Sequence, residues 1–441
     1  MLTTLRNAFK IKEIRNKLLF TLAMLVVIRI GSQLPVPGVD GSVFAKWFEA
    51  QTGGAFSFFD AITGGSFSSM AVLALGINPY ITSSIIIQLM TIAIPALEEM
   101  QKDGESGRKK MTAITRYVTV GLALIQSTAM AIGFGRQGYL IDYSDHKILS
   151  ILVAVATLTA GSAFLMWVGE RITEKGVGNG ISIVLLINII SRLPQDIASL
   201  FERFVFGVKA PATAVLAAVV IIAIIVGMVV MVVYLNAATR HIPVQYAKKM
   251  QGRKMVGGQT SNIPLKVNTA GVIPVIFAQS LMQLPIIICT FAGYEGSGFW
   301  AHVLRALNSD NWCRPSDLKY SVGLLLYIAL IVFFAYFYTA ITFNPMMVAD
   351  NIKKQGGFIP GIRPGKPTSD YLNSVLNSII FIGAVGLTIV SVIPYIFNGV
   401  FGASVSFGGT SLIIIVSVIL ETMNQVESQM LVRNYKGFLE S

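Results

Sequence analysis

Residues 371–420 carry no charged side chain and read YLNSVLNSIIFIGAVGLTIVSVIPYIFNGVFGASVSFGGTSLIIIVSVIL. A helix needs about 20 apolar residues to cross the roughly 30 Å of hydrocarbon in a bilayer. Asn398 and Gly399 interrupt the run near its middle, and this pair is typical of a turn. The run therefore predicts two membrane-spanning helices joined by a tight turn at Asn398 and Gly399.

The composition of all 441 residues agrees with this interpretation. The chain is 54% hydrophobic and 13% charged, and its mean hydropathy is +0.68. These values are typical of a polytopic helical membrane protein rather than of a β-barrel. The first apolar run leads through a short loop into further runs, so we expect an uncleaved first helix and not a signal peptide.

Ten apolar runs of this kind follow one another along the chain. They lie at residues 18–34, 72–94, 117–134, 148–168, 181–190, 215–235, 271–291, 322–342, 374–396 and 410–420. The fifth run is short and is completed by the residues that reach Leu193. Ten crossings divide into five before and five after the connection at residues 203–211. Halves with an odd number of spans are inverted relative to each other, as in many transporters and channels.

The distribution of positive charge predicts the orientation. With the amino terminus inside, the inner segments hold 24 Lys and Arg, the outer loops hold 9, and Arg29 lies within the first run. Short cytoplasmic loops collect Lys and Arg. We therefore expect both termini in the cytoplasm.

Two inner segments are longer and more basic than connectors need to be. Residues 240–266 hold six basic and no acidic side chains, and residues 344–370 hold Lys353, Lys354, Arg363 and Lys366 in a Gly- and Pro-rich sequence. Membrane orientation and anionic phospholipid account for inner basic residues in general. For these two segments we also predict docking on an acidic or phosphate-bearing partner, such as ribosomal RNA or a protein.

Residues that would support catalysis or ion coupling are missing from the sequence pattern. Pro367 follows Gly365 and Lys366, without the glycine spacing of a phosphate-binding loop. The long runs lack the carboxylates and His pairs of ion-coupled transporters. The two Cys and three His are scattered, so we expect no metal site, no cofactor and no enzyme activity. Arg29 is expected to snorkel or to pair with a neighbouring loop, with a functional intramembrane charge as the alternative.

The segment between the first two runs is too interrupted for a full crossing. Residues 56–70 read FSFFDAITGGSFSSM. Half-length elements persist at membrane depth only where protein or a water-filled cavity surrounds them. The segment is either a glycine-jointed stopper inside a funnel or an amphipathic outer loop.

Five blocks of sequence resemble one known family. They are GINPYITSSIIIQL at residues 76–89, GERITEKGVGNGISI at 169–183, LKVNTAGVIPVIFAQS at 265–280, FIPGIRPGKPT at 358–368 and FGGTSLIIIV at 407–416. Together, and in this order, they are similar to the SecY family, the channel subunits of the bacterial protein translocase. The resemblance implies an all-α polytopic membrane protein with ten transmembrane helices in two inverted five-helix halves around a central pore, closed by a short plug helix.

The resemblance also implies roles for particular residues. The ring at the pore constriction falls on Ile81, Ile85, Ile181, Leu185, Ile276 and Ile414. The plug falls on Phe58, Phe59, Asp60, Ala61, Ile62, Thr63, Gly64, Gly65, Ser66, Phe67, Ser68 and Ser69. The residues that bind the SecA ATPase or the ribosome fall on Arg240, Lys248, Lys249, Arg253, Lys254 and Arg363.

Members of this family open sideways to lipid, between the second and third helices of one half and the seventh and eighth helices of the other. Pro274 and Pro285 are expected to interrupt the seventh span and to let it bend. The implied partners are the SecE and SecG subunits, SecA, the ribosome, signal-sequence-bearing polypeptides, SecD/SecF, YidC and anionic phospholipid.

We therefore expect a passive translocation channel in the bacterial cytoplasmic membrane. Its parts are a cytoplasmic segment at residues 1–17, a first half at 18–203 with the plug at about 58–69, a second half at 204–423 with cytoplasmic loops at about 237–268 and 343–370, and a cytoplasmic tail at 424–441. A secondary transporter of a small solute is the alternative, supported by the span count but opposed by the lack of coupling charges. A membrane-embedded enzyme is a more distant one.

Overall fold

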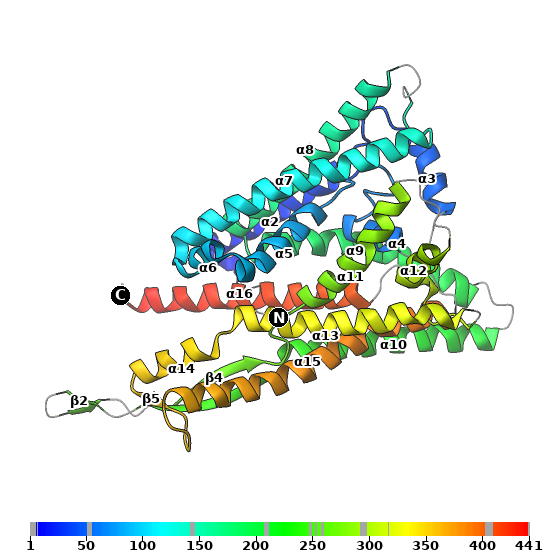
Figure 1. Ribbon diagram of the computed structural model, residues 1–441. Coiled ribbons are helices and arrows are strands. Elements are labelled where there is room, and N and C mark those ends of the chain that lie inside the picture. Colours follow the sequence, from blue (N-terminus) through cyan, green and yellow to red (C-terminus); the bar gives the residue numbers. More distant parts are fainter. Residues whose placement is uncertain are drawn as a thin grey trace.

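Two sets of long helices lie side by side in the computed structural model of this protein (Figure 1). The structure describes residue 6 and residues 8–50, 55–141, 146–206, 211–246, 249–251, 254–256, 260–291, 298–315, 317–401 and 409–439. The first set precedes residue 207 and the second follows residue 210.

The first set has five long or bent helices and two short ones. The long ones are α2 (Lys12–Gly31), α5 (Asn78–Ala93) with its continuation α6 (Pro95–Lys102), α7 (Gly104–Arg136), α8 (Lys147–Lys175) and α9 (Gly180–Phe201). The short ones, α3 (Gly41–Ala50) and α4 (Ala55–Thr63), lie between α2 and α5. A π-helical turn, η1 (Glu202–Phe206), ends this set.

The second set repeats this number of long helices. They are α10 (Pro211–Ala237), α11 (Ile273–Phe291), α13 (Val322–Thr342), α15 (Lys366–Phe401) and α16 (Gly409–Leu439). The shorter elements are α12 (Phe299–Leu307), the 3₁₀ turns η2 (Ser309–Asn311) and η3 (Leu318–Ser321), and α14 (Pro345–Lys354).

Each of the ten predicted apolar runs falls largely on one of these helices. Seven helical segments of the described chain are long and apolar enough to cross a membrane, and an eighth results if α5 and α6, bent by 107°, count as one span. The apolar helix α11 is shorter, and α2 begins with Lys12, Glu13 and Arg15. The chain is therefore a multi-pass helical membrane protein, and the count of ten stays a prediction.

The second predicted run begins later than expected. Residues 72–77 form turns, and α5 starts only at Asn78 with Pro79 in its first turn. Gly76 adopts φ +60°, which disfavours a helix for the segment before it.

The predicted interruption of the seventh span by Pro274 is also wrong. Pro274 lies in the first turn of α11, where a missing N–H costs nothing, and only Pro285 lies inside that helix.

The predicted turn at Asn398 and Gly399 is wrong as well. Helix α15 continues through both residues to Phe401. A side chain at position 399 would lie 2.2 Å from the backbone oxygen of Trp312. This glycine therefore permits a close approach between a helix and a loop, and the connection to α16 falls at residues 402–408, outside the described residues.

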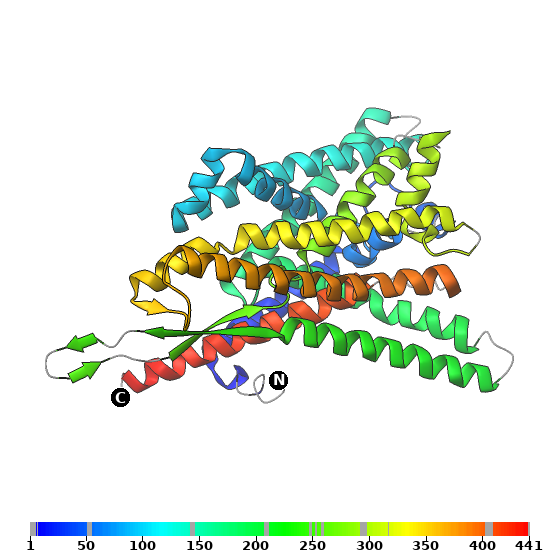
Figure 2. The same cartoon turned by 60° about the horizontal axis from the view of Figure 1, so that its bottom comes forward.

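The first basic segment is a β-hairpin, which the sequence analysis did not predict. Strand β1 (Thr239–Tyr246) pairs antiparallel with β4 (Thr260–Lys266), so that Thr239 faces Lys266 and Gln245 faces Thr260. Beyond them β2 (Lys249–Gln251) pairs with β3 (Lys254–Val256), and the hairpin projects from the helices (Figure 2). Strand β5 (Gly357–Phe358), from the second basic segment, pairs with the other edge of β1.

Candidate pore constriction

The six predicted ring residues come from four helices that belong to both sets. Ile81 and Ile85 lie on α5, Ile181 and Leu185 on α9, Ile276 on α11 and Ile414 on α16. Residues four positions apart share one face of a helix. Each of the first two helices therefore presents two aliphatic side chains in the same direction.

The structure brings five of the six together. Leu185, Ile276 and Ile414 are buried members of one apolar cluster, and Ile81 and Ile181 pack against it. Ile85 instead packs against a neighbouring cluster formed by α10, α11, α13, α15, α16 and Trp312. Every described member of the first cluster apart from Tyr80 has a purely hydrocarbon or thioether side chain, so the cluster offers almost no hydrogen-bonding group.

The predicted plug segment lies against this cluster. Ile62 of α4 is 4% exposed and belongs to the cluster itself. The α-helix in this segment ends at Thr63, and the residues up to Met70 form turns. Phe67 is buried among the aromatic side chains of Phe44 and Phe59, with ring centroids 5.7 and 5.0 Å away. Residues 60–64, Ser66 and Phe67 of this segment are thus buried inside the protein, whereas Ser69 is exposed. Phe58 falls among residues whose side chains are not described.

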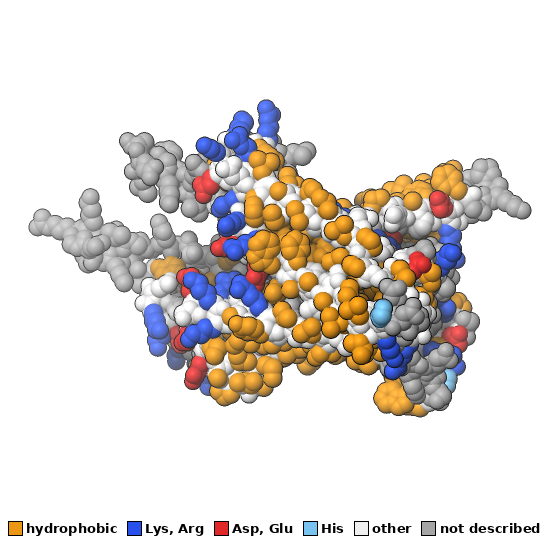
Figure 3. Space-filling view, turned by 90° about the horizontal axis from the view of Figure 1, so that it is seen from above, with side chains coloured by type: hydrophobic (Ala, Val, Ile, Leu, Met, Phe, Trp, Pro, Cys, Tyr) orange, Lys and Arg blue, Asp and Glu red, His pale blue; other side chains and the backbone are white. Residues whose placement is uncertain are grey.

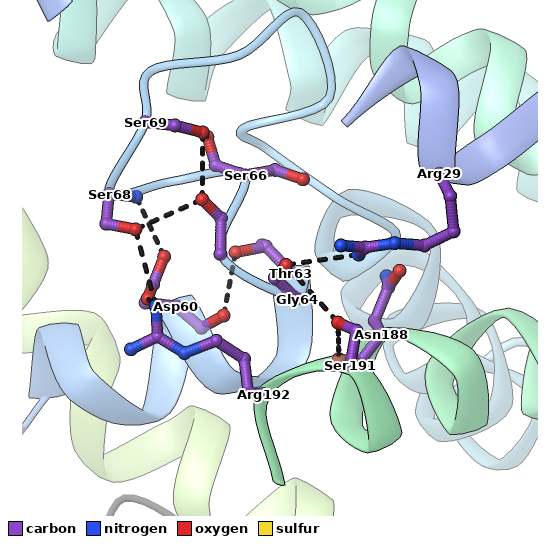
Figure 4. A network of polar contacts seen from close by, with 11 residues as sticks. Arg29, Asp60, Thr63, Gly64, Ser66, Ser68, Ser69, Asn188, Ser191 and Arg192 are labelled. Atoms are coloured by element: carbon purple, nitrogen blue, oxygen red, sulfur yellow. Dashed lines mark hydrogen bonds and ion pairs between the residues drawn. The ribbon is translucent and has the colours of Figure 1, made fainter. Parts of the chain in front are cut away.

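A buried ion pair holds the segment to α9 (Figure 4). Asp60 is fully buried, and its Oδ2 lies 2.5 Å from Nη1 of Arg192. The backbone N–H of Ser68 donates to the other carboxylate oxygen at 2.7 Å. Charges in a low-dielectric interior are tolerated when they are paired and hydrogen-bonded. The sequence alone assigns Arg192 to an outer loop and identifies no partner for it, whereas the structure pairs it with Asp60.

A second set of contacts fixes the turn after α4. Nη1 of Arg29, on α2, donates to the carbonyl oxygen of Gly64 at 3.1 Å. The hydroxyl of Ser191 approaches the same oxygen at 3.4 Å. Gly64 adopts φ +70°, and a Cβ there would lie 2.9 Å from both Arg29 and the backbone of Asn188. Only glycine fits this position, and Arg29 pairs with a neighbouring segment rather than standing alone.

A cavity of about 430 Å³ opens beside the constriction, between α5, α7 and α11. Its lining is mostly apolar, with a few polar side chains that include Asn78, Gln126 and Gln283. Ile62 and Phe67 of the plug segment also line it. The cavity therefore lies between α5 and α7 of the first set and α11 of the second, next to the predicted plug segment.

The described residues of the predicted partner-binding set lie at the far end of the molecule. Arg240 on β1 and Arg363 after β5 are exposed. Lys249 and Lys254 lie on β2 and β3, although their side chains are not described, and Lys248 and Arg253 fall outside the described residues. Because β1 pairs with both β4 and β5, and Ile242, Val244 and Leu265 pack with α14 and α15, the two basic segments form one unit.

Comparison with known proteins decides the family. The profile of the SecY family matches residues 71–423. The chain is 44% identical to the protein translocase subunit SecY of Streptomyces scabiei and 41% identical to that of Bacillus licheniformis, over the full length of both chains in each case. The chain belongs to the SecY family.

Solved structures confirm that it has the fold of this family. The structure of a protein-conducting channel matches with a TM-score of 0.64 and 19% identity, covering 95% of this chain and 93% of that one. A structure in which the plug domain of the SecY protein stabilises the closed state matches with a TM-score of 0.66 and 19% identity, covering 95% and 92%. Sec61 in the canine ribosome-channel complex matches with a TM-score of 0.60 and 17% identity, covering 95% and 94%.

Proposed function

We propose that this chain forms the pore of a bacterial protein translocase and conducts unfolded, signal-bearing polypeptides across the cytoplasmic membrane. The chain belongs to the SecY family, and one observation in its structure supports the proposal. Aliphatic side chains from four helices of both sets meet in one buried cluster that also holds Ile62 of the plug segment. A closed constriction between two halves of a channel has this construction.

The chemistry of the cluster suits a seal for a protein-conducting pore. Branched aliphatic side chains give a hydrated ion no favourable site, and a narrow apolar constriction tends to dewet. They also make no hydrogen bond that would retain a passing polypeptide. Side chains that differ in rotamer can adapt to substrate residues of different size. The ring is therefore proposed to close around the substrate without binding it.

The segment of residues 58–69 is proposed to act as the plug of the closed pore. It is packed against the cluster through Ile62 and anchored to α9 and α2 by Arg192 and Arg29. Opening the pore requires this segment to move, and movement breaks the ion pair of Asp60. The strength of that pair would then set part of the free energy of opening.

The cavity between α5, α7 and α11 is proposed as the lateral exit for hydrophobic segments. Its apolar lining matches a signal sequence, and it lies between helices of the two sets. Pro285 inside α11 removes one helical hydrogen bond and permits bending there. A hydrophobic segment could pass from the pore through this side into lipid.

The elements and the basic residues at one end of the molecule support an orientation in the membrane and a set of partners. The hairpin, α6, α14 and the end of α16 lie together in Figure 1, and α3 and α12 lie at the opposite end. Lys and Arg gather toward the first of these ends in Figure 3, beyond a broad hydrophobic band. We place this end in the cytoplasm, where the hairpin and β5 would dock SecA or the ribosome. SecE and SecG would complete the complex in the membrane.

Reconstituted transport tests the proposed function. The chain, purified with its cognate SecE and SecG in proteoliposomes and supplied with SecA and ATP, should render a radiolabelled presecretory polypeptide resistant to added protease. Protection should require ATP and an intact signal sequence. A folded and correctly oriented complex that protects none of the polypeptide would contradict the proposal.

A further inference from the structure

The loop between α11 and α13 carries an aromatic surface that the pore does not use. Helix α12 lies at the end of the molecule opposite the hairpin (Figure 1). Phe299 and Trp300, at its first two positions, are 76% and 62% exposed. Their rings contact edge to face with centroids 6.2 Å apart. Two adjacent, mostly exposed aromatic residues are unusual on a surface that faces only water.

Trp312, which follows α12, is firmly packed against the spans, so this exposure does not come from a loosely placed helix. Trp312 is 1% exposed, and its Nε1 donates to the carbonyl oxygen of Ala306 at 2.7 Å. Its ring lies 5.5 Å from Tyr327 and 5.0 Å from Tyr395, which belong to α13 and α15. Leu307 joins the same cluster. The carboxyl end of α12 is thus fixed to the spans.

The other side of α12 is polar and is also held in place. Nδ1 of His302 lies 3.0 Å from the hydroxyl of Tyr320, and the two rings stack. Arg305 is exposed, and Nζ of Lys319 lies 5.0 Å from the centre of the Tyr320 ring. The helix therefore combines an exposed aromatic pair with nearby cationic side chains.

The position of α12 next to the ends of two spans indicates which part of the surroundings contacts Phe299 and Trp300. The helix lies between the end of α11 at Phe291 and the start of α13 at Val322. Beside it, the exposed apolar surface continues from Leu318 through Val322 to Leu325, which are 67%, 63% and 66% exposed. In a multi-pass protein such a helical surface faces lipid. Trp and other aromatic residues concentrate where that surface meets the headgroups.

We infer that α12 is an interfacial membrane anchor, with Phe299 and Trp300 inserted at the headgroup boundary of the bilayer on the side opposite the hairpin. Lipid is the occupant because α12 contacts η3 and α13, which form a candidate membrane span from Leu318 onward with exposed apolar side chains. The inference requires only that the chain spans a membrane, and it does not depend on polypeptide conduction. Through its contacts with α11 and α13, the anchor would fix the depth of these two helix ends.

Tryptophan fluorescence of the full-length chain in its complex, in lipid nanodiscs, tests this inference. The chain has four tryptophans, so the contribution of Trp300 is the difference between the wild type and Trp300→Phe, a variant that keeps an apolar ring. We expect lipid brominated high on its acyl chains to quench this contribution at least about twofold, and lipid brominated near the chain ends to quench it less. The difference for Trp312→Phe, which reports a buried side chain, should be insensitive to both lipids.

Two results would overturn the inference. Quenching of the Trp300 contribution by acrylamide in water, but not by either brominated lipid, would show that α12 faces solvent. Protection from acrylamide and from both lipids would show that protein, such as a second copy of the chain, covers it. Because the readout is optical, a channel that fails to transport does not affect it.

Discussion

Asp60 and Arg192 form an ion pair between α9 and the segment that we propose as the plug. If this pair stabilises the closed pore, the two single substitutions should differ. Arg192→Ala leaves a buried carboxylate without its partner, which costs about 3–5 kcal/mol. Asp60→Asn removes the charge and retains an oxygen for the Ser68 N–H. We predict a large increase in the ion conductance of resting complexes in planar bilayers for Arg192→Ala and a smaller one for Asp60→Asn.

The double variant provides the sharper test of this pair. Adding Asp60→Asn to Arg192→Ala should lower the conductance below that of Arg192→Ala alone, because no buried charge then remains. Arg203→Ala is the matched control, since Arg203 is exposed on η1. Wild-type conductance of Arg192→Ala, or an equal increase for Arg203→Ala, would show that the ion pair does not hold the plug segment.

The contacts of individual residues could be predicted from the sequence only where they depend on residues nearby in the chain. The spacing of Ile81 and Ile85 places them on one face of a helix, but it could not show that Ile85 packs against a different cluster. The partner of Asp60 lies 132 residues away, beyond any local pattern. One signal was available, because a lone carboxylate in an apolar segment needs a partner inside the protein.

Among the elements, the hairpin and β5 form the proposed docking unit, and Arg363 is one of its exposed predicted contacts. Its side chain is exposed, and the hydrogen bond from Thr368 goes to its backbone oxygen, so no internal contact depends on the charge. Arg363→Glu should weaken binding of SecA or the ribosome by at least about tenfold, because a charge-assisted hydrogen bond contributes about 1.5–3 kcal/mol. Co-sedimentation measures the binding, and thermal unfolding should be unchanged.

Lys366→Glu gives the matched control for this reversal. Lys366 is also exposed and changes the net charge equally, but it begins α15 and was not among the predicted contacts. We expect it to weaken binding less than Arg363→Glu. Equal losses for both variants would indicate a general attraction to positive charge instead of a defined site, and unchanged binding for Arg363→Glu would reject the assignment.

The helices were predictable from the sequence and the strands were not, for a physical reason. Long apolar runs need lipid or a core around them, and this fixes their type and approximate position. The hairpin has few apolar residues, and its pairing with β5 involves a segment about 110 residues away. The alternation of buried Ile242 and Val244 with exposed neighbours was its only local signal. The Asn398 and Gly399 pair misled because a glycine suits a close helix contact as well as a turn.

In the whole molecule, the two sets of helices are proposed to enclose a polypeptide path at the aliphatic cluster. The sequence predicted the division into two sets, and the structure adds how they meet. Helices α5 and α9 come from one set and α11 and α16 from the other, and Ile62 of the proposed plug segment belongs to the same cluster. A path between the sets explains why the ring residues are distant in sequence and adjacent in space.

Crosslinking of a stalled substrate tests this path most directly. Cysteines at Ile276 and Ile414 are compared with cysteines at Leu281 and Ile419, which are 49% and 39% exposed on the same helices. Each control lies five residues on, about 140° around its helix. With Cys289 and Cys313 replaced by Ser, a translocation intermediate bearing one cysteine should crosslink to positions 276 and 414 and not to 281 and 419. Equal crosslinking at all four positions, or none at the two ring positions, would contradict the account.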